Sequence, residues 1–217
     1  MGEYLLGLDV GSSSVKASLL SVETGRRIDA ATCPRTEMAI SAPKSGWAEQ
    51  DPGMWWRYVG EAIQELRQRH QREIESVAAV GISYQMHGLV PVDRNGEVLR
   101  PSIIWCDSRA VSYGNAALEA LGRLRVLSTL LNSPGNFTAA KLAWVKDQEP
   151  ELFQRIWKIM LPGDYIAYRL TGEVKTTYSG LSEGIFWDFT KNEVSRALLD
   201  HFGFDPGLLP EAHESFA

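Results

Sequence analysis

The segment "LLGLDVGSSSVKASLL", residues 5–20, places a carboxylate two positions before a turn of one glycine and three serines. Apolar runs flank the turn on both sides, so it is expected to join two strands. The backbone N–H groups and hydroxyls of such a turn can form a nest for an anion such as phosphate. Asp9, at the end of the first strand, could hold Mg²⁺ beside the phosphates, because this ion favours one or two carboxylates together with phosphate oxygens. We interpret Asp9 and the turn residues as a candidate magnesium and phosphate site. The turn residues are Gly11, Ser12, Ser13 and Ser14.

Two other kinds of phosphate loop do not fit this segment. The GxxxxGK[ST] pattern is absent because no lysine followed by Ser or Thr stands at the required place. The GxGxxG pattern is also absent, and the residues after the turn are typical of a strand rather than the helix that this pattern requires. A polar hairpin turn with an acid nearby stays open as the alternative, since Gly-Ser turns are common.

A second group of polar residues follows the apolar run 77–83, which is expected to be a strand buried on both faces. Gln85, Met86 and His87 come just past its end, where ligands of α/β sheets bind. A histidine followed by Gly88, with polar groups on either side, could clamp the hydroxyls of a sugar. The alternative is a loop histidine without a ligand.

The segment "SIIWCDSR" contributes a third group, in which Trp105 precedes Asp107 and Arg109. An aromatic face beside a carboxylate is typical of carbohydrate sites, so Trp105 and Asp107 are candidate substrate contacts. Taken alone, Trp105 is more often explained as a core residue.

These residues must be positioned by a mixed α/β fold. The pattern predicts an antiparallel meander at the N-terminus and then a helix that begins at Pro52 with Asp51 as its N-cap. Negative charge is favourable at a helix N-terminus, which also accounts for Glu49. The meander strands are predicted at residues 4–10, 15–22 and 26–33, and later helices at residues 108–131, 138–156 and 193–203, with a short helix closed by Gly172.

Composition excludes several classes of protein. The 217 residues carry 22 basic and 27 acidic side chains, a formal charge of −5 without a basic block, which argues against nucleic-acid and membrane partners. The two cysteines, Cys33 and Cys106, show neither metal-binding nor disulfide spacing. No signal peptide or membrane span is indicated, so a cytoplasmic protein is expected.

The chain resembles the FGGY family of carbohydrate kinases. The segments that carry the resemblance are "LLGLDVGSSSVKASLL", "GWAEQDP", "GISYQMHGLVPVDRNGEVLRPSIIWCDSR" and "GNFTAAKLAWVKDQEPELFQRIWKIMLPGDYIAYRLTGE". They follow one another over nearly the whole chain. Within the family the third and fourth segments are most similar to the xylulose kinases.

The resemblance implies a ribonuclease-H-like fold of the actin and hexokinase type, with a mixed sheet, flanking helices, and ATP and Mg²⁺ as cofactors. It implies that Asp9 lies near magnesium, that the turn Gly11 to Ser14 holds phosphate, and that Met86 and His87 contact a ketose. Trp105 and Asp107 are expected to flank the same pocket. Small-molecule partners, a ketose and ATP, are therefore expected, and a homodimer stays open.

The sequence departs from the family in one respect. The family's catalytic base is an aspartate in a segment of the form Gly-Gly-x-Asp-Asn, and no such segment occurs in these 217 residues. The general base is therefore expected beyond Ala217, the last residue of the sequence. Residues 1–217 are expected to be the N-terminal domain of an ATP-dependent kinase that converts D-xylulose to D-xylulose 5-phosphate, inactive without the rest. The alternatives are a kinase for ribulose, fuculose or glycerol, and a sensor of sugar or nucleotide without catalysis.

Overall fold

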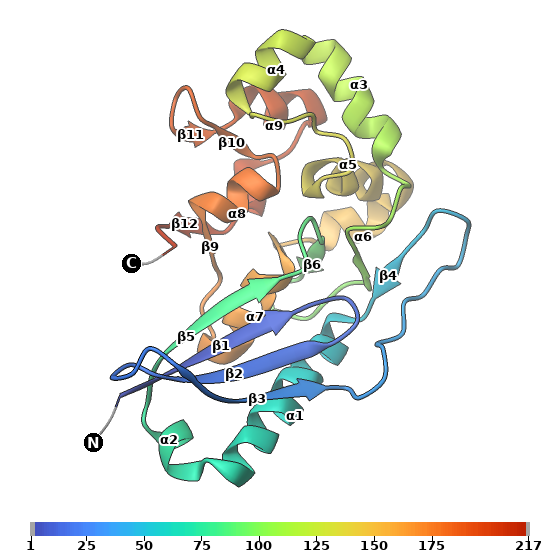
Figure 1. Ribbon diagram of the computed structural model, residues 1–217. Coiled ribbons are helices and arrows are strands. Elements are labelled where there is room, and N and C mark those ends of the chain that lie inside the picture. The colour runs from blue at the N-terminus through green and yellow to red at the C-terminus, as the bar shows by residue number, and fades with distance from the viewer. Residues whose placement is uncertain (1–2, 216–217) are drawn as a thin grey trace. The chain divides into compact units, whose positions relative to one another are not determined.

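The computed structural model describes residues 3–215, which divide into two compact units (Figure 1). The first unit combines the chain up to Ile40 with Gln50–Gln85, and the second combines Ser41–Glu49 with the chain from Met86 onward. The short strand β4 (Glu49–Gln50) contains one of the crossings from one unit to the other.

The catalytic base is expected beyond Ala217, outside the residues that the structure describes. Ala217 itself lies outside the described residues, which end at position 215. The position of the base therefore stays a prediction from the sequence.

A four-stranded sheet in the order β3-β2-β1-β5 forms the centre of the first unit. Its strands are β1 (Tyr4–Val10), β2 (Val15–Ser21), β3 (Arg27–Cys33) and β5 (Val77–Tyr84). The first three pair antiparallel and β5 pairs parallel to β1, so the predicted meander is confirmed. Alternate side chains of β1 and β2 are buried, as period-two alternation requires for a half-covered sheet.

Helix α1 (Pro52–Arg69) covers this sheet and begins where the sequence predicts. The Asp51 carboxylate accepts a hydrogen bond from the backbone N–H of Gly53 at 2.9 Å, and Pro52 occupies the first helical position. Buried side chains follow the helical period, and the short helix α2 (Gln71–Glu75) leads into β5. The buried side chains of α1 are Pro52, Trp55, Val59, Ala62 and Leu66.

The expectation that residues 77–83 are buried on both faces is wrong. Ala78, Ala79, Val80 and Gly81 are exposed within the described residues, with Val80 at 44% exposure. The run pairs parallel with β1 and lies at the edge of the four-stranded order. Composition indicates the strand but does not show what covers it.

The second unit consists mainly of helices with short strand pairs. Its strands are β6 (Val90–Val92), β7 (Ser102–Ile103), β8 (Lys158–Met160), β9 (Lys175–Thr177), β10 (Trp187–Asp188), β11 (Glu193–Val194) and β12 (Glu211–His213). Its helices are α3 (Val111–Leu121), α4 (Arg123–Thr129), α5 (Thr138–Gln148), α6 (Pro150–Arg155), α7 (Pro162–Thr171), α8 (Tyr178–Glu183) and α9 (Arg196–Phe202), with a 3₁₀ turn at Pro206–Leu208. A continuous hydrophobic core joins α3, α5, α8 and α9.

Two predicted helices are each broken in the structure. The helix expected over residues 108–131 divides at Gly122, whose φ of 87° does not continue a right-handed helix. The helix expected over residues 138–156 divides at Glu149, because Pro150 disfavours the helical conformation at the residue before it. Apolar periodicity continues through both breaks, so periodicity alone does not reveal them. In the described residues, no helix has the length and apolar character needed to span a membrane.

Candidate functional site

The Gly-Ser turn is held by its carbonyl groups. The carbonyl of Ser12 accepts from the Gln50 side chain at 2.7 Å, that of Ser13 from the Met38 N–H at 2.8 Å, and that of Ser14 from the Gly11 N–H at 3.0 Å. In a trans peptide the N–H points away from its carbonyl. The N–H groups of Ser13 and Ser14, which follow the first two of these carbonyls, therefore point away from the donors on Gln50 and Met38, as an anion nest requires. The turn fits phosphate.

Gly11 is needed in this turn for a steric reason. A Cβ at this position would lie 3.1 Å from the Ser14 carbonyl oxygen, closer than side chains ordinarily approach backbone. The same oxygen accepts the hydrogen bond that closes the turn. A glycine therefore permits the turn to remain this tight.

Asp9 lies on the exposed face of the sheet beside the turn. It is directly opposite Lys16 on β2 and Ser83 on β5, so these three side chains share one face. The Ser83 hydroxyl donates to Asp9 Oδ1 at 3.2 Å. Lys16 is exposed on that face. An exposed carboxylate next to an anion nest fits a magnesium ion shared with phosphate oxygens.

Gln50 makes several hydrogen bonds inside the first unit, and no local pattern in the sequence indicates this role. Its Nε2 donates to Ser12, and its Oε1 accepts from Trp55 Nε1 and from Gln85 Nε2, each at 3.0 Å. Gln85 is buried, and its N–H donates to the Val10 carbonyl. The predicted site residue Gln85 therefore supports the Gly-Ser turn through Gln50.

The predicted site residues divide between the two units. The first unit holds Asp9, the turn and Gln85, and the second holds Met86, His87, Trp105 and Asp107. Within the second unit, Met86 and Trp105 are 55% and 50% exposed, which argues against a core role for Trp105. The Asn136 amide donates to the Trp105 and Asp107 carbonyls, and the next side chain, Phe137, has its ring 4.1 Å from the His87 ring. His87 and Trp105 thus contact the same segment.

His87 is held in an uncommon conformation. Its φ is 60°, in the left-handed region that residues other than glycine seldom adopt. Burial, together with the positive charge of Lys141, lowers the pKa of the imidazole to about 4, so the ring is neutral at physiological pH. A neutral imidazole offers one donor and one acceptor, which suits a sugar hydroxyl.

Gly88 follows His87 and is also fixed by space. A Cβ there would meet the Pro162 ring at 2.5 Å. The carbonyl of Gly88 accepts a long hydrogen bond from the Thr138 hydroxyl at 3.4 Å. The His-Gly pair is therefore pressed against the start of α7 and the start of α5.

Asp107 is completely buried and has several hydrogen-bond partners. It accepts from the Ala48 N–H at 2.6 Å and forms a bidentate pair with Arg109, whose closest contact is 2.6 Å. The ring of Trp47 lies 3.7 Å from the Arg109 guanidinium. A sugar contact at this carboxylate would have to displace one of these donors.

Glu49 belongs to the same buried network, so the attribution of its charge to the helix N-terminus is wrong. It accepts from Arg109 at 2.7 Å and from Arg100, which also pairs with Glu149. The buried arginines explain why position 49 is acidic, because a buried cation needs an anionic partner. Sequence spacing gives no signal of this pairing because the partners are about fifty to sixty residues apart.

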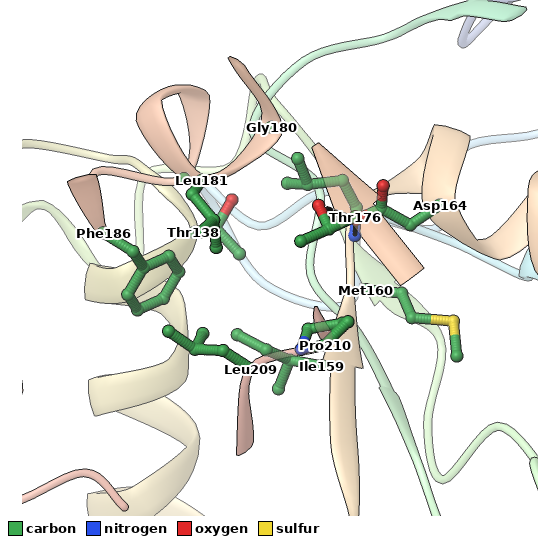
Figure 2. A pocket seen from close by; sticks show the side chains of 12 residues that line it. Thr138, Ile159, Met160, Asp164, Thr176, Gly180, Leu181, Phe186, Leu209 and Pro210 are labelled. Atoms are coloured by element: carbon green, nitrogen blue, oxygen red, sulfur yellow. Dashed lines mark hydrogen bonds between the residues drawn. The ribbon is translucent and has the colours of Figure 1, made fainter. Parts of the chain in front are cut away.

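A small pocket in the second unit does not suit a substrate. It measures about 20 Å³ and is lined mostly by apolar side chains, together with Thr138, Thr176 and Asp164 (Figure 2). That volume holds about one water molecule, which excludes a sugar or nucleotide. Asp164 accepts from the Leu161 N–H and the Thr176 hydroxyl, each at 3.0 Å, and burial raises its pKa to about 7. Its role is structural.

Comparison with known proteins decides the family. The family model described as the N-terminal domain of the FGGY family of carbohydrate kinases matches residues 4–217. The chain belongs to this family. The FGGY xylulose kinase of Escherichia coli (strain K12) is 35% identical over 209 residues, which is 96% of this chain and 42% of that protein. The chain therefore spans less than half the length of this curated relative.

Solved structures agree with the FGGY assignment. A xylulose kinase from Brucella ovis superposes with a TM-score of 0.89 at 36% identity, covering 98% of this chain and 43% of that one. A gluconate kinase from Lactobacillus acidophilus superposes with a TM-score of 0.87 at 26% identity, covering 98% of this chain and 42% of that one. The predicted α/β fold of the actin and hexokinase type is confirmed.

Proposed function

We propose that this chain is the N-terminal domain of an ATP-dependent sugar kinase that phosphorylates a ketopentose, D-xylulose foremost. The observation that carries the proposal is the Gly-Ser turn, whose Ser12, Ser13 and Ser14 carbonyls all accept hydrogen bonds from the protein beside the exposed carboxylate of Asp9. The similarity to xylulose kinases at about one-third identity supports the choice of sugar.

In the proposed reaction, a sugar hydroxyl oxygen bonds to the γ-phosphorus of ATP, the bond to ADP breaks, and the hydroxyl proton leaves to a base. Magnesium, when bound, neutralises charge on the phosphate oxygens. Asp9 would hold this ion, and the N–H groups of the turn would hold the phosphates. Lys16 lies opposite Asp9 in register and adds positive charge to the same face.

The second unit would supply the sugar contacts. The neutral imidazole of His87 offers a donor and an acceptor, and the exposed side chains of Trp105 and Met86 offer apolar contact. The base is the part that these residues do not provide, because no Gly-Gly-x-Asp-Asn segment occurs in the sequence up to Ala217. We therefore expect weak sugar binding without turnover from residues 1–217 alone.

The test combines binding and turnover on the purified 217-residue protein. Saturation-transfer NMR should detect D-xylulose in preference to ribulose, fuculose and glycerol, and His87→Ala should abolish the signal. A coupled assay should detect no sugar-dependent ADP. Sugar-dependent ADP would overturn the expected inactivity, whereas no preference among sugars would overturn the ketopentose assignment.

The DNA sequence downstream of the codon for Ala217 provides an independent test between the kinase and the sensor. A continuing reading frame that encodes Gly-Gly-x-Asp-Asn supports the kinase. A stop codon at that point, together with sugar binding, would replace the kinase by a sensor of sugar or nucleotide.

A further inference from the structure

Two side chains from distant parts of the sequence hold the backbone of His87. Its N–H donates to Glu183 Oε1 at 2.7 Å, and its carbonyl accepts from Lys141 Nζ at 2.5 Å. Both groups of one residue are thus bonded to charged side chains, one from the end of α8 and one from α5. This residue has a φ of 60°, a conformation that persists only where its surroundings enforce it.

Lys141 is an unusual residue for this purpose. Its side chain is completely buried, and burial lowers its pKa to about 7 although the carboxylates of Asp107 and Glu183 act in the opposite direction. A buried lysine destabilises a protein unless its ammonium group is paired and hydrogen-bonded. Its Nζ donates to the carbonyl of His87. A methionine or leucine would fill this space without the penalty, so the amine has a specific task.

Glu183 also faces the ring of His87. Its Oε1 lies 4.0 Å from Nδ1, an atom that is buried and has no hydrogen-bond partner among residues 3–215. A nearby carboxylate favours the tautomer with the proton on Nδ1. Nε2 then remains as an acceptor, and the Phe137 ring, 4.1 Å away, limits rotation of the imidazole.

We propose that Lys141 and Glu183 are positioning residues that clamp His87 in its left-handed conformation and present Nε2 of its ring as an acceptor for a ligand hydroxyl. The clamp is argued from this geometry alone. The identity of the ligand as a ketose rests on the proposed function.

The chain contains a matched control for Lys141. Lys146 lies on the same helix, and its Nζ also donates to backbone carbonyls, those of Phe202 and Gly203 at 2.6 and 2.7 Å. Replacing either lysine by methionine removes the same chemical group from α5. Only Lys141→Met removes it from His87.

Hydrogen exchange of the 217-residue protein tests the clamp without any ligand. In Lys141→Met, we expect the peptide covering residues 85–89 to exchange about tenfold faster, because the His87 carbonyl loses its partner and the loosened backbone opens the hydrogen bond from the His87 N–H to Glu183 more often. Peptides from α1 should be unchanged, and Lys146→Met should leave residues 85–89 at the wild-type rate. Unchanged exchange at residues 85–89 in Lys141→Met, or equal acceleration in Lys146→Met, would overturn the clamp.

The ring gives a second readout that a merely structural role would not change. Nitrogen NMR of the histidines should show the His87 proton on Nδ1, and Lys141→Met should raise the imidazole pKa because a nearby positive charge is lost. Glu183→Gln keeps an acceptor for the backbone N–H but loses the charge. It should therefore retain slow exchange while the ring shifts toward the other tautomer. A proton on Nε2 in the wild type would overturn the assigned acceptor.

These outcomes are separable from those of the proposed function. If the exchange and NMR results appear but no sugar binds, the clamp stands and the ketose is wrong. If D-xylulose binds the wild type and Lys141→Met binds it equally well, the sugar stands and the clamp has no part in its recognition.

Discussion

The side chain of Gln50 donates to the carbonyl of Ser12 at 2.7 Å and at the same time accepts from Gln85 at 3.0 Å. One buried amide therefore connects the Gly-Ser turn to the end of β5, although the three residues are far apart in sequence. The turn derives its shape from this amide as well as from its own residues.

Replacing Gln50 by alanine should destabilise the protein by about 2–3 kcal/mol, because Trp55 Nε1 and Gln85 Nε2 lose their acceptor inside the protein. Chemical denaturation measures this change. Gln64→Ala on the exposed side of α1 serves as the control and should change stability by less than about 0.5 kcal/mol. Equal effects of the two substitutions would contradict the role of Gln50.

Replacing Asp107 by alanine should lower the free energy of unfolding by about 3–5 kcal/mol, because it leaves Arg109 buried without its bidentate partner. Asp200→Ala, which breaks an exposed pair with Arg196, should cost less than about 1 kcal/mol. Thermal unfolding of both variants checks the difference. A stable Asp107→Ala protein that loses only sugar affinity would instead make Asp107 a direct substrate contact.

Two glycines should respond to alanine in opposite directions. Gly88→Ala should destabilise by about 1–3 kcal/mol, because the new methyl group would meet the Pro162 ring. Gly60 lies within α1 with open space around its Cα, so Gly60→Ala should stabilise by about 0.5–1 kcal/mol. A melting temperature of Gly88→Ala that does not fall would show that the contact between the new methyl group and Pro162 is relieved.

Asp164 and Asp188 are buried to similar extents but should give opposite pH dependences. The folded-state pKa of Asp164 is raised to about 7, so the native state holds a proton that the unfolded state releases, and stability falls as pH rises from about 4 to about 7. Asp164→Asn should remove this slope, which denaturation midpoints between pH 4 and 8 would measure.

For Asp188, burial acts to raise the pKa, but hydrogen bonds from Thr190 and Lys191 lower it overall. Its contribution to stability is therefore present above the unfolded pKa, near 4, and is lost as pH falls below it. Asp188→Asn should remove the loss of stability at acid pH and leave the pH dependence of stability between pH 5 and 8 unchanged. A change in the slope of stability against pH between pH 5 and 8 would contradict the assignment.

Local signals in the sequence predicted much of the first unit. The meander alternates with period two, and Asp51 with Pro52 marks the start of α1, so short-range rules were sufficient. Gly122 and Pro150 were visible as helix breakers, but the apolar pattern continues across both and led to helices that were too long.

The features that the sequence did not reveal depend on distant partners. Glu49 is explained only by Arg100 and Arg109, and the conformation of His87 only by Lys141 and Glu183. Each partner lies about fifty or more residues away, where spacing rules carry no information. The segment "GNFTAAK" did carry the family resemblance, yet its lysine acts through a backbone carbonyl that no motif specifies.

The chain passes between its two units after Ile40, after Glu49 and after Gln85. Neither unit is therefore a single continuous stretch of the gene. A recombination event or an engineered fusion with one junction inside residues 41–85 would combine parts of both units from different parents. Gln50 would then need partners from both parents, because Ser12 precedes such a junction and Gln85 follows it. Exchange between relatives is expected to preserve this region intact, so that the two units are inherited together.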